Sequence, residues 1–160
     1  MKINIKNQIK TLSFSFFVII GLPILFVTLG DEFNISFIVL MMVSLILPTY
    51  LYLEYLYFSK GTEIQLDYCN NNIVIIKNNE VEIINFKNIL LIEKHCSFPI
   101  AENRIQWLPT DEFLFFQLTF DNGRTEIIPC FITFDLYIPL VKSEVKKKFI
   151  PSILVYFIMK

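Results

Sequence analysis

The sequence FLFFQLTFDNGRTEII, residues 113–128, predicts a β-hairpin. Two runs suited to strands flank DNGR, and Asn122 and Gly123 provide the positive φ angles of a tight turn between paired strands. Pro129 ends the second arm because proline has no N–H to donate to a strand ladder. This hairpin indicates that the C-terminal two thirds of the chain is built on an antiparallel sheet.

Upstream of the hairpin, four further strands are predicted. Residues 62–68 alternate polar and apolar side chains, and residues 73–76, 81–86 and 89–94 are short runs rich in isoleucine and valine. Asparagine-rich breaks at 70–72 and 77–80 separate the first three runs and favour turns. These strands form a meander, and residues 97–110, with two prolines and no periodicity, are expected to be a loop.

Downstream of the hairpin, apolar residues recur every four positions at Tyr137, Val141, Val145 and Phe149. This spacing predicts one apolar stripe on an amphipathic helix. The expected fold class is therefore α+β, with a bent antiparallel sheet or half-open barrel over residues 61–150 that is capped by a C-terminal helix. Residues 151–160 form a short apolar tail that could close against the sheet or lie on a membrane; we expect the second arrangement.

The N-terminal third is much more apolar than the rest. Residues 11–30 carry no charge, and a second uncharged run begins at residue 33, so 11–30 and 33–56 each match the ~20 residues of a membrane-spanning helix. The turn between them is short, which predicts a two-helix transmembrane hairpin. Lys2, Lys6, Lys10 and Lys60 flank the hairpin, so residues 1–10 and the β domain are expected in the cytoplasm, as in a multi-pass protein of a bacterial inner membrane.

Two alternatives to this hairpin are less favoured. The first apolar run could be a cleaved signal peptide, but it is longer than a usual signal core and no small-residue cleavage site follows it. Both runs could instead be buried helices of a globular core, although neither shows a polar stripe at helical spacing.

The order of elements carries a resemblance. The strand-turn-strand over 63–76, the segment 82–93, the hairpin 116–123 and the closing helix together resemble bacterial PH-like (pleckstrin-homology-like) membrane proteins. The resemblance implies a seven-stranded bent sheet and a binding or scaffolding role. Basic side chains that bind phosphoinositides in classical members are missing from the corresponding turn, residues 68–72, so that activity is not expected here.

Residues suited to catalysis or metal binding are few. The one histidine, His95, precedes Cys96, but neighbours on a strand point to opposite faces and cannot form a nucleophile–base pair. The three cysteines lack paired metal-ligand spacing and are expected to be free thiols. We therefore predict no catalytic residue, no metal and no cofactor, and a protein that is not an enzyme and has no evident small-molecule substrate.

Charge and composition narrow the choice of partners. Of 160 residues, 14 are basic and 15 acidic, so no bulk positive field favours nucleic acid. The favoured function is a non-catalytic, membrane-anchored binding or scaffolding protein whose partners are the lipid bilayer and an unidentified protein. Trp107 and Arg104 are the candidate partner-binding residues, and Lys146, Lys147 and Lys148 could contact lipid headgroups. The alternative is an accessory subunit of a larger membrane complex.

Overall fold

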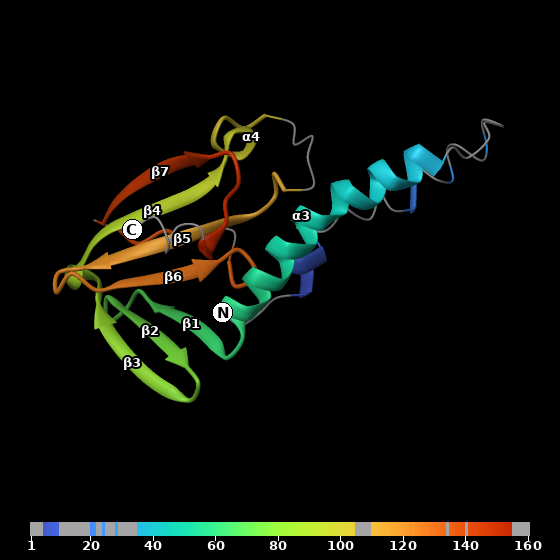
Figure 1. The fold of residues 1–160 in the computed structure, drawn as a ribbon. Helices are drawn as coiled ribbons and strands as arrows, with labels where there is room; N and C mark the ends of the chain where they lie inside the picture. The colour runs from blue at the N-terminus through green and yellow to red at the C-terminus, as the bar shows by residue number, and fades with distance from the viewer. Residues whose placement is uncertain are drawn as a thin grey trace.

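A computed structural model describes residues 5–9, 20–21, 24, 28, 35–104, 110–133, 135–139 and 141–154. The fold combines one long helix with two β-sheets (Figure 1). Its elements, in chain order, are α3 (Ile35–Ser59), β1 (Thr62–Asp67), β2 (Asn72–Lys77), β3 (Glu80–Asn85), the 3-10 turn η2 (Phe86–Asn88), β4 (Ile89–Ser97), α4 (Phe98–Ala101), β5 (Leu114–Phe120), β6 (Thr125–Pro129) and β7 (Lys142–Lys148).

The first sheet is the predicted meander, with strand order β1-β2-β3 and antiparallel pairing throughout. Asparagines shape both of its turns. Asn78 and Asn79 take φ values of 51° and 71°, the left-handed conformation that a two-residue hairpin turn requires. In the turn between β1 and β2, the Asp67 carboxylate accepts hydrogen bonds from the backbone N–H groups of Cys69 and Asn70. These turns confirm the predicted strand pairing.

The second sheet has the order β6-β5-β4-β7 and includes the predicted hairpin of β5 and β6. Its turn differs in detail, because only Gly123 (φ 79°) is left-handed. The Gly123 N–H donates to the Phe120 carbonyl at 3.0 Å, and the Phe120 N–H donates to the Arg124 carbonyl at 2.9 Å. The connection is thus a three-residue loop closed by glycine, which joins the strands with the correct twist.

The predicted C-terminal helix is wrong. Residues 142–148 form β7, which pairs in parallel with β4 at the end of the sheet. Tyr137, Val145 and Phe149, three of the four residues of the expected apolar stripe, are 70%, 55% and 76% exposed, whereas Leu136 and Ile138 are buried. Burial therefore alternates along residues 135–139, and three of the four positions of the predicted stripe are exposed.

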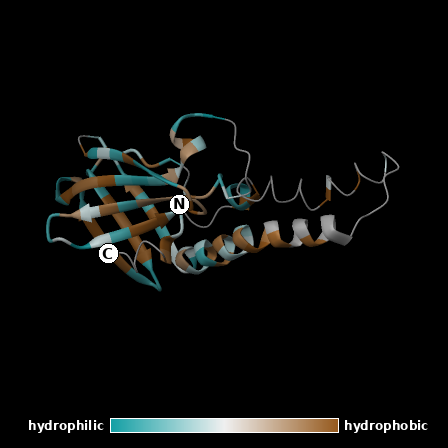
Figure 2. Cartoon of the chain, turned by 45° about the horizontal axis from the view of Figure 1, so that its top comes forward, coloured by the Kyte–Doolittle hydropathy of each residue, from teal (hydrophilic) through white to brown (hydrophobic). Residues whose placement is uncertain are grey.

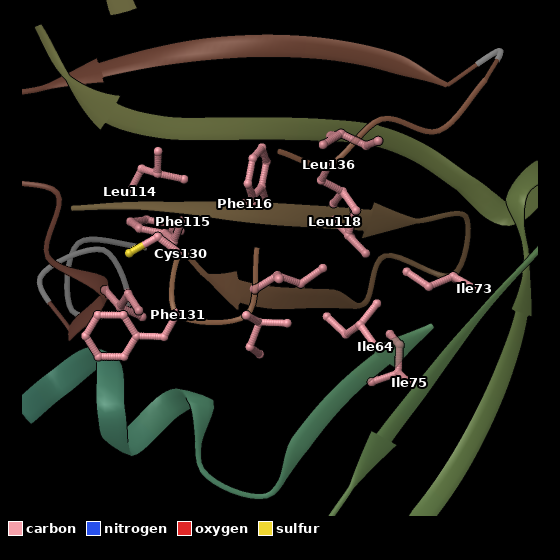
Figure 3. Close-up of a cluster of buried hydrophobic side chains, with 14 of the residues drawn as sticks. Ile64, Ile73, Ile75, Leu114, Phe115, Phe116, Leu118, Cys130, Phe131 and Leu136 are labelled. Carbon is pink, nitrogen blue, oxygen red and sulfur yellow. The ribbon is translucent and has the colours of Figure 1, made fainter. Parts of the chain in front are cut away.

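The core lies around β5, whose side chains are buried on both faces. Leu114 and Phe116 project to one side, and Phe115 projects to the other, toward Cys130 and Phe131 (Figure 3). The inner face of the first sheet completes the core with further isoleucines, namely Ile64, Ile73 and Ile75. In Figure 2 the strands carry alternating hydrophobic and hydrophilic bands, as expected when each strand separates the core from its surroundings.

The C-terminal turns of α3 pack into this core. Leu51 and Tyr55 are fully buried, and the Tyr55 ring lies 5.1 Å from Phe113 and 5.9 Å from Phe131, measured between ring centroids. Beside them, the Tyr52 ring lies 5.4 Å from the Phe131 ring. The helical residues 5–9 reach the same region, since the Asn7 amide donates to the Cys130 carbonyl at 3.1 Å. The end of α3 is therefore a core element of the β domain.

The expected transmembrane hairpin is contradicted. Within the described parts of the chain, no helix combines the length and apolar character that crossing a membrane requires. Part of the apolar run assigned to the second span, 33–56, is used to pack α3 against the sheets, as Leu51 and Tyr55 show. Most of the first expected span, 11–30, lies outside the described residues. The predicted two-helix hairpin and multi-pass membrane localisation are thus corrected.

The segment after β7 is held by two adjacent residues of α3. The Glu54 carboxylate accepts hydrogen bonds from the Ser152 hydroxyl at 3.0 Å and from the Leu154 N–H. The Tyr55 hydroxyl donates to the Pro151 carbonyl at 2.5 Å. Pro151, Ser152 and Ile153 are buried, so this described part of the tail closes against α3. The expectation that the tail lies on a membrane is not met for these residues.

Gly61 turns the chain from α3 into β1. Its φ of 72° is the left-handed conformation typical of the residue after a helix end. The Gly61 carbonyl accepts a hydrogen bond from the Asn78 N–H at 3.0 Å, which ties the helix end to the β2–β3 turn. A Cβ at this position would lie 2.7 Å from the Asn78 Oδ1, so the Asn78 side chain would have to move away.

We predict that Gly61→Ala lowers the free energy of unfolding by about 2 kcal/mol, because alanine adds both left-handed strain and this contact. Gly123→Ala is the matched control. This variant has the same left-handed strain, but no atom lies within 4 Å of the added Cβ, so the free energy of unfolding should fall by about 1 kcal/mol. Urea unfolding of the two variants measures the difference, and equal losses would contradict the close-contact argument.

We also predict a pH dependence from Glu54. Burial raises the pKa of this carboxyl above its ordinary value of 4.5, although the hydrogen bonds from Leu154 and Ser152 oppose the shift. Because its pKa is raised in the folded state, Glu54 makes its full contribution to the free energy of unfolding below pH 4.5. That contribution is lost as the pH rises through the folded-state pKa. Wild type should therefore lose stability relative to Glu54→Gln between pH 4.5 and neutrality.

Glutamine keeps an acceptor for Ser152 and Leu154 but does not titrate, so the comparison isolates the buried charge. Urea unfolding of both proteins across this pH range provides the measurement. A constant difference between them would show that Glu54 does not titrate differently in the folded and unfolded states.

Candidate binding surface

Strand β7 is an edge of the second sheet and the most basic strand of the fold. Its sequence KSEVKKK holds four lysines and one glutamate, a net charge of +3, whereas the whole chain has a net charge of −1. Lys142, Lys146 and Lys147 are exposed. Because side chains alternate along a strand, Lys142 and Lys146 lie on one face and Lys147 on the other. We call this strand with its neighbours Glu102 and Arg104 the basic edge.

One face of the basic edge carries a lysine–glutamate ladder. The Lys142 ammonium lies 2.7 Å from Glu144, and the Lys146 ammonium lies 3.1 Å from Glu144 and 3.4 Å from Glu93 on β4. Hydrogen bonds from the two lysines, Lys142 foremost, lower the pKa of Glu144. The hydrogen bond to Glu144 raises the pKa of Lys146, and the pairing with Glu93 raises it further. This ladder therefore keeps its charges at neutral pH.

The other face brings together Arg104 and Lys147, which the sequence suggested for two different kinds of partner. The Glu102 carboxylate lies 2.9 Å from the Lys147 ammonium and 3.0 Å from the Arg104 guanidinium. The hydrogen bond from Lys147, assisted by the charge of Arg104, lowers the pKa of Glu102. Glu102 follows α4, which packs beside β7 and β4. One carboxylate thus joins the candidate partner-binding arginine to the candidate lysine cluster.

Lys148 differs from the other lysines because it is partly buried. Its ammonium lies 5.9 Å from the centre of the Phe115 ring, and the His95 ring stacks on Phe115 at 4.6 Å with an interplanar angle of 4°. Burial lowers the pKa of Lys148. Lys148 is consequently suited to support the strand from within the fold, and its charge is less available to a partner than those of Lys146 and Lys147.

His95 and Cys96 do not form a nucleophile–base pair. His95 pairs across the sheet with Phe115 and Cys96 with Leu114, so the two neighbours lie on opposite faces of β4 as predicted. Cys69, Cys96 and Cys130 form no disulfide bond, and burial raises the pKa of Cys96, which disfavours its reactive thiolate. Among the described residues, no group of three histidine, cysteine or acidic side chains is placed to hold a metal ion.

The structure places the predicted site residues in different surroundings. Arg104 and Lys147 share Glu102, Lys146 and Lys148 border β4, and Trp107 lies outside the described residues. The lysines stand on an edge strand instead of the expected helix. The acidic partners Glu93 and Glu102 were not selected from the sequence, because nothing in their spacing relates them to residues about 50 positions away.

No family model, curated protein or solved structure matches this chain, and the resemblance to PH-like proteins stays a prediction.

Proposed function

We propose that this protein is a non-catalytic binding protein that holds an acidic, extended segment of a partner protein along the basic edge. The observation that carries the proposal is the concentration of lysines on β7, the end strand of its sheet. An edge strand can bind an extended peptide through its main chain, and side chains on both faces then provide selectivity.

Charge complementarity favours an acidic partner. The exposed lysines already attract carboxylates of their own chain, since each of Lys142, Lys146 and Lys147 contacts a glutamate within 3.4 Å. These pairs are surface contacts, which contribute little to stability and can be exchanged for a partner's carboxylates. Lysines on an edge strand also discourage pairing with another neutral or basic strand, so they select against the wrong partners.

Neighbouring apolar side chains add a second element of recognition. Val145 on β7 and Phe98 on α4 are exposed beside the lysines. A partner segment that alternates acidic and apolar residues could contact both kinds of group. The basic edge is thus suited to a segment that alternates acidic and apolar residues, and not to negative charge alone.

We predict that a fluorescent seven-residue peptide of alternating glutamate and valine, matched to the length of β7, binds the full chain saturably. Affinity should fall as salt is added, because the lysines are exposed. Lys146→Gln with Lys147→Gln should weaken binding roughly fivefold, since each exposed pair contributes a fraction of a kcal/mol. Fluorescence anisotropy measures these affinities.

The matched control is Lys6→Gln with Lys87→Gln, which removes the same charge from exposed positions outside β7. Equal weakening by the two double variants would show that only net charge matters. Absence of peptide binding, or binding to anionic lipid vesicles in its place, would contradict the proposal.

Glu102→Gln should have the opposite effect and strengthen peptide binding. This change removes the carboxylate that Lys147 and Arg104 share and leaves both cations available to the partner. A two- to fivefold gain in affinity is expected, on the order of one surface ion pair. If Glu102→Gln instead weakens binding, Glu102 holds the edge in its binding conformation and does not compete with the partner.

A further inference from the structure

A hollow of 570 Å³ lies where α3 meets the first sheet, at the opposite side of the fold from β7 (Figure 1). Its described lining is Tyr57, Phe58, Lys60, Gly61, Lys77 and Asn78. The volume is within the range of about 300–1,000 Å³ that is typical of small-molecule sites. The hollow is independent of the basic edge and of the function proposed for it.

Two contacts contribute to the walls of the hollow. The rings of Tyr57 and Phe58 meet edge to face, with centroids 5.6 Å apart and planes at 89°. The hydrogen bond from the Asn78 N–H to the Gly61 carbonyl holds the turn at the end of β2 against the end of α3. An aromatic wall and a backbone turn thus form the hollow without requiring any large movement.

The electrostatics of the hollow favour an anion. Two lysines contribute to its lining, and none of the residues named is acidic. Lys77 contacts Glu126 at 3.5 Å, but the Arg124 guanidinium holds the same carboxylate at 2.6 Å. Lys77 is therefore the more weakly bound of the two cations that share Glu126, and its ammonium can turn toward a ligand. A cationic ligand would be repelled by both lysines despite the aromatic rings.

From this combination we propose that the hollow binds a small aromatic organic anion, with its phosphate or carboxylate between Lys60 and Lys77 and its ring against Tyr57 and Phe58. Lysine ammonium groups bind phosphate as point charges and suit either kind of anionic group. The amino-acid pattern does not indicate this site, because Lys60 and Lys77 are separated by a complete hairpin along the chain.

The test uses phenyl phosphate as the probe, with inorganic phosphate and phenol as the two halves of that molecule. Calorimetry on the full chain should show saturable binding of phenyl phosphate that is tighter than that of either half. Amide resonances of Gly61 and Asn78 should shift on titration. No saturable binding at millimolar phenyl phosphate, or equally tight binding of either half, would overturn the proposal.

Variants then separate the charge from the aromatic wall. Lys60→Gln and Lys77→Gln should each weaken phenyl phosphate binding roughly tenfold, as expected for a hydrogen bond to a charged group. The charge control is Lys87→Gln, which removes one exposed charge outside both surfaces. Tyr57→Ala should weaken phenyl phosphate but not inorganic phosphate, and Tyr137→Ala is its control, since the two tyrosines are 74% and 70% exposed. Equal effects of test and control variants would assign the binding to the general surface.

Failure of this proposal is distinguishable from failure of the proposed function. The peptide test depends on Lys146 and Lys147, whereas the phenyl phosphate test depends on Lys60 and Lys77, and each pair lies outside the other surface.

Discussion

The insertion of the end of α3 into the aromatic core is the contact on which the rest of the fold depends. Tyr55 is fully buried among Phe113, Phe115 and Phe131, which belong to β5 and to the residues that precede it or follow β6. Aromatic side chains bury large apolar areas and contribute strongly to the stability of a core. Because Tyr55 also donates to the Pro151 carbonyl, one side chain links the helix, the second sheet and the segment after β7.

This packing also defines the two candidate surfaces. Strand β7 is held along its length by its pairing with β4. The residues that follow it are held to α3 by Glu54 and Tyr55. At the other side, the end of α3 and Gly61 place Tyr57 and Lys60 against the β2–β3 turn, which creates the hollow. Disturbing the helix end should therefore affect both surfaces, whereas exposed lysines can be changed without affecting the core.

The local patterns predicted the strands well. Alternation and asparagine turns located β1 to β3, and the run of apolar residues with Gly123 located β5 and β6, each to within one or two residues. The same approach failed for residues 137–149, where three positions spaced by four are exposed and β7 is formed by a lysine-rich segment. A period of four cannot identify a helix when the buried residues, such as Leu136 and Ile138, lie at the positions between.

The antiparallel strands β1 to β6, their turns, the opposite orientation of His95 and Cys96, and the basic character of residues 146–148 could all be predicted from the amino-acid pattern. Each of these follows from neighbouring residues along the chain. Three other features emerge only in the folded chain: β7 pairs in parallel with β4, Glu102 joins Lys147 to Arg104, and α3 packs its last turns into the core. Those features depend on residues about 40 to 100 positions apart, and an apolar helix carries no local signal for what its side chains will contact.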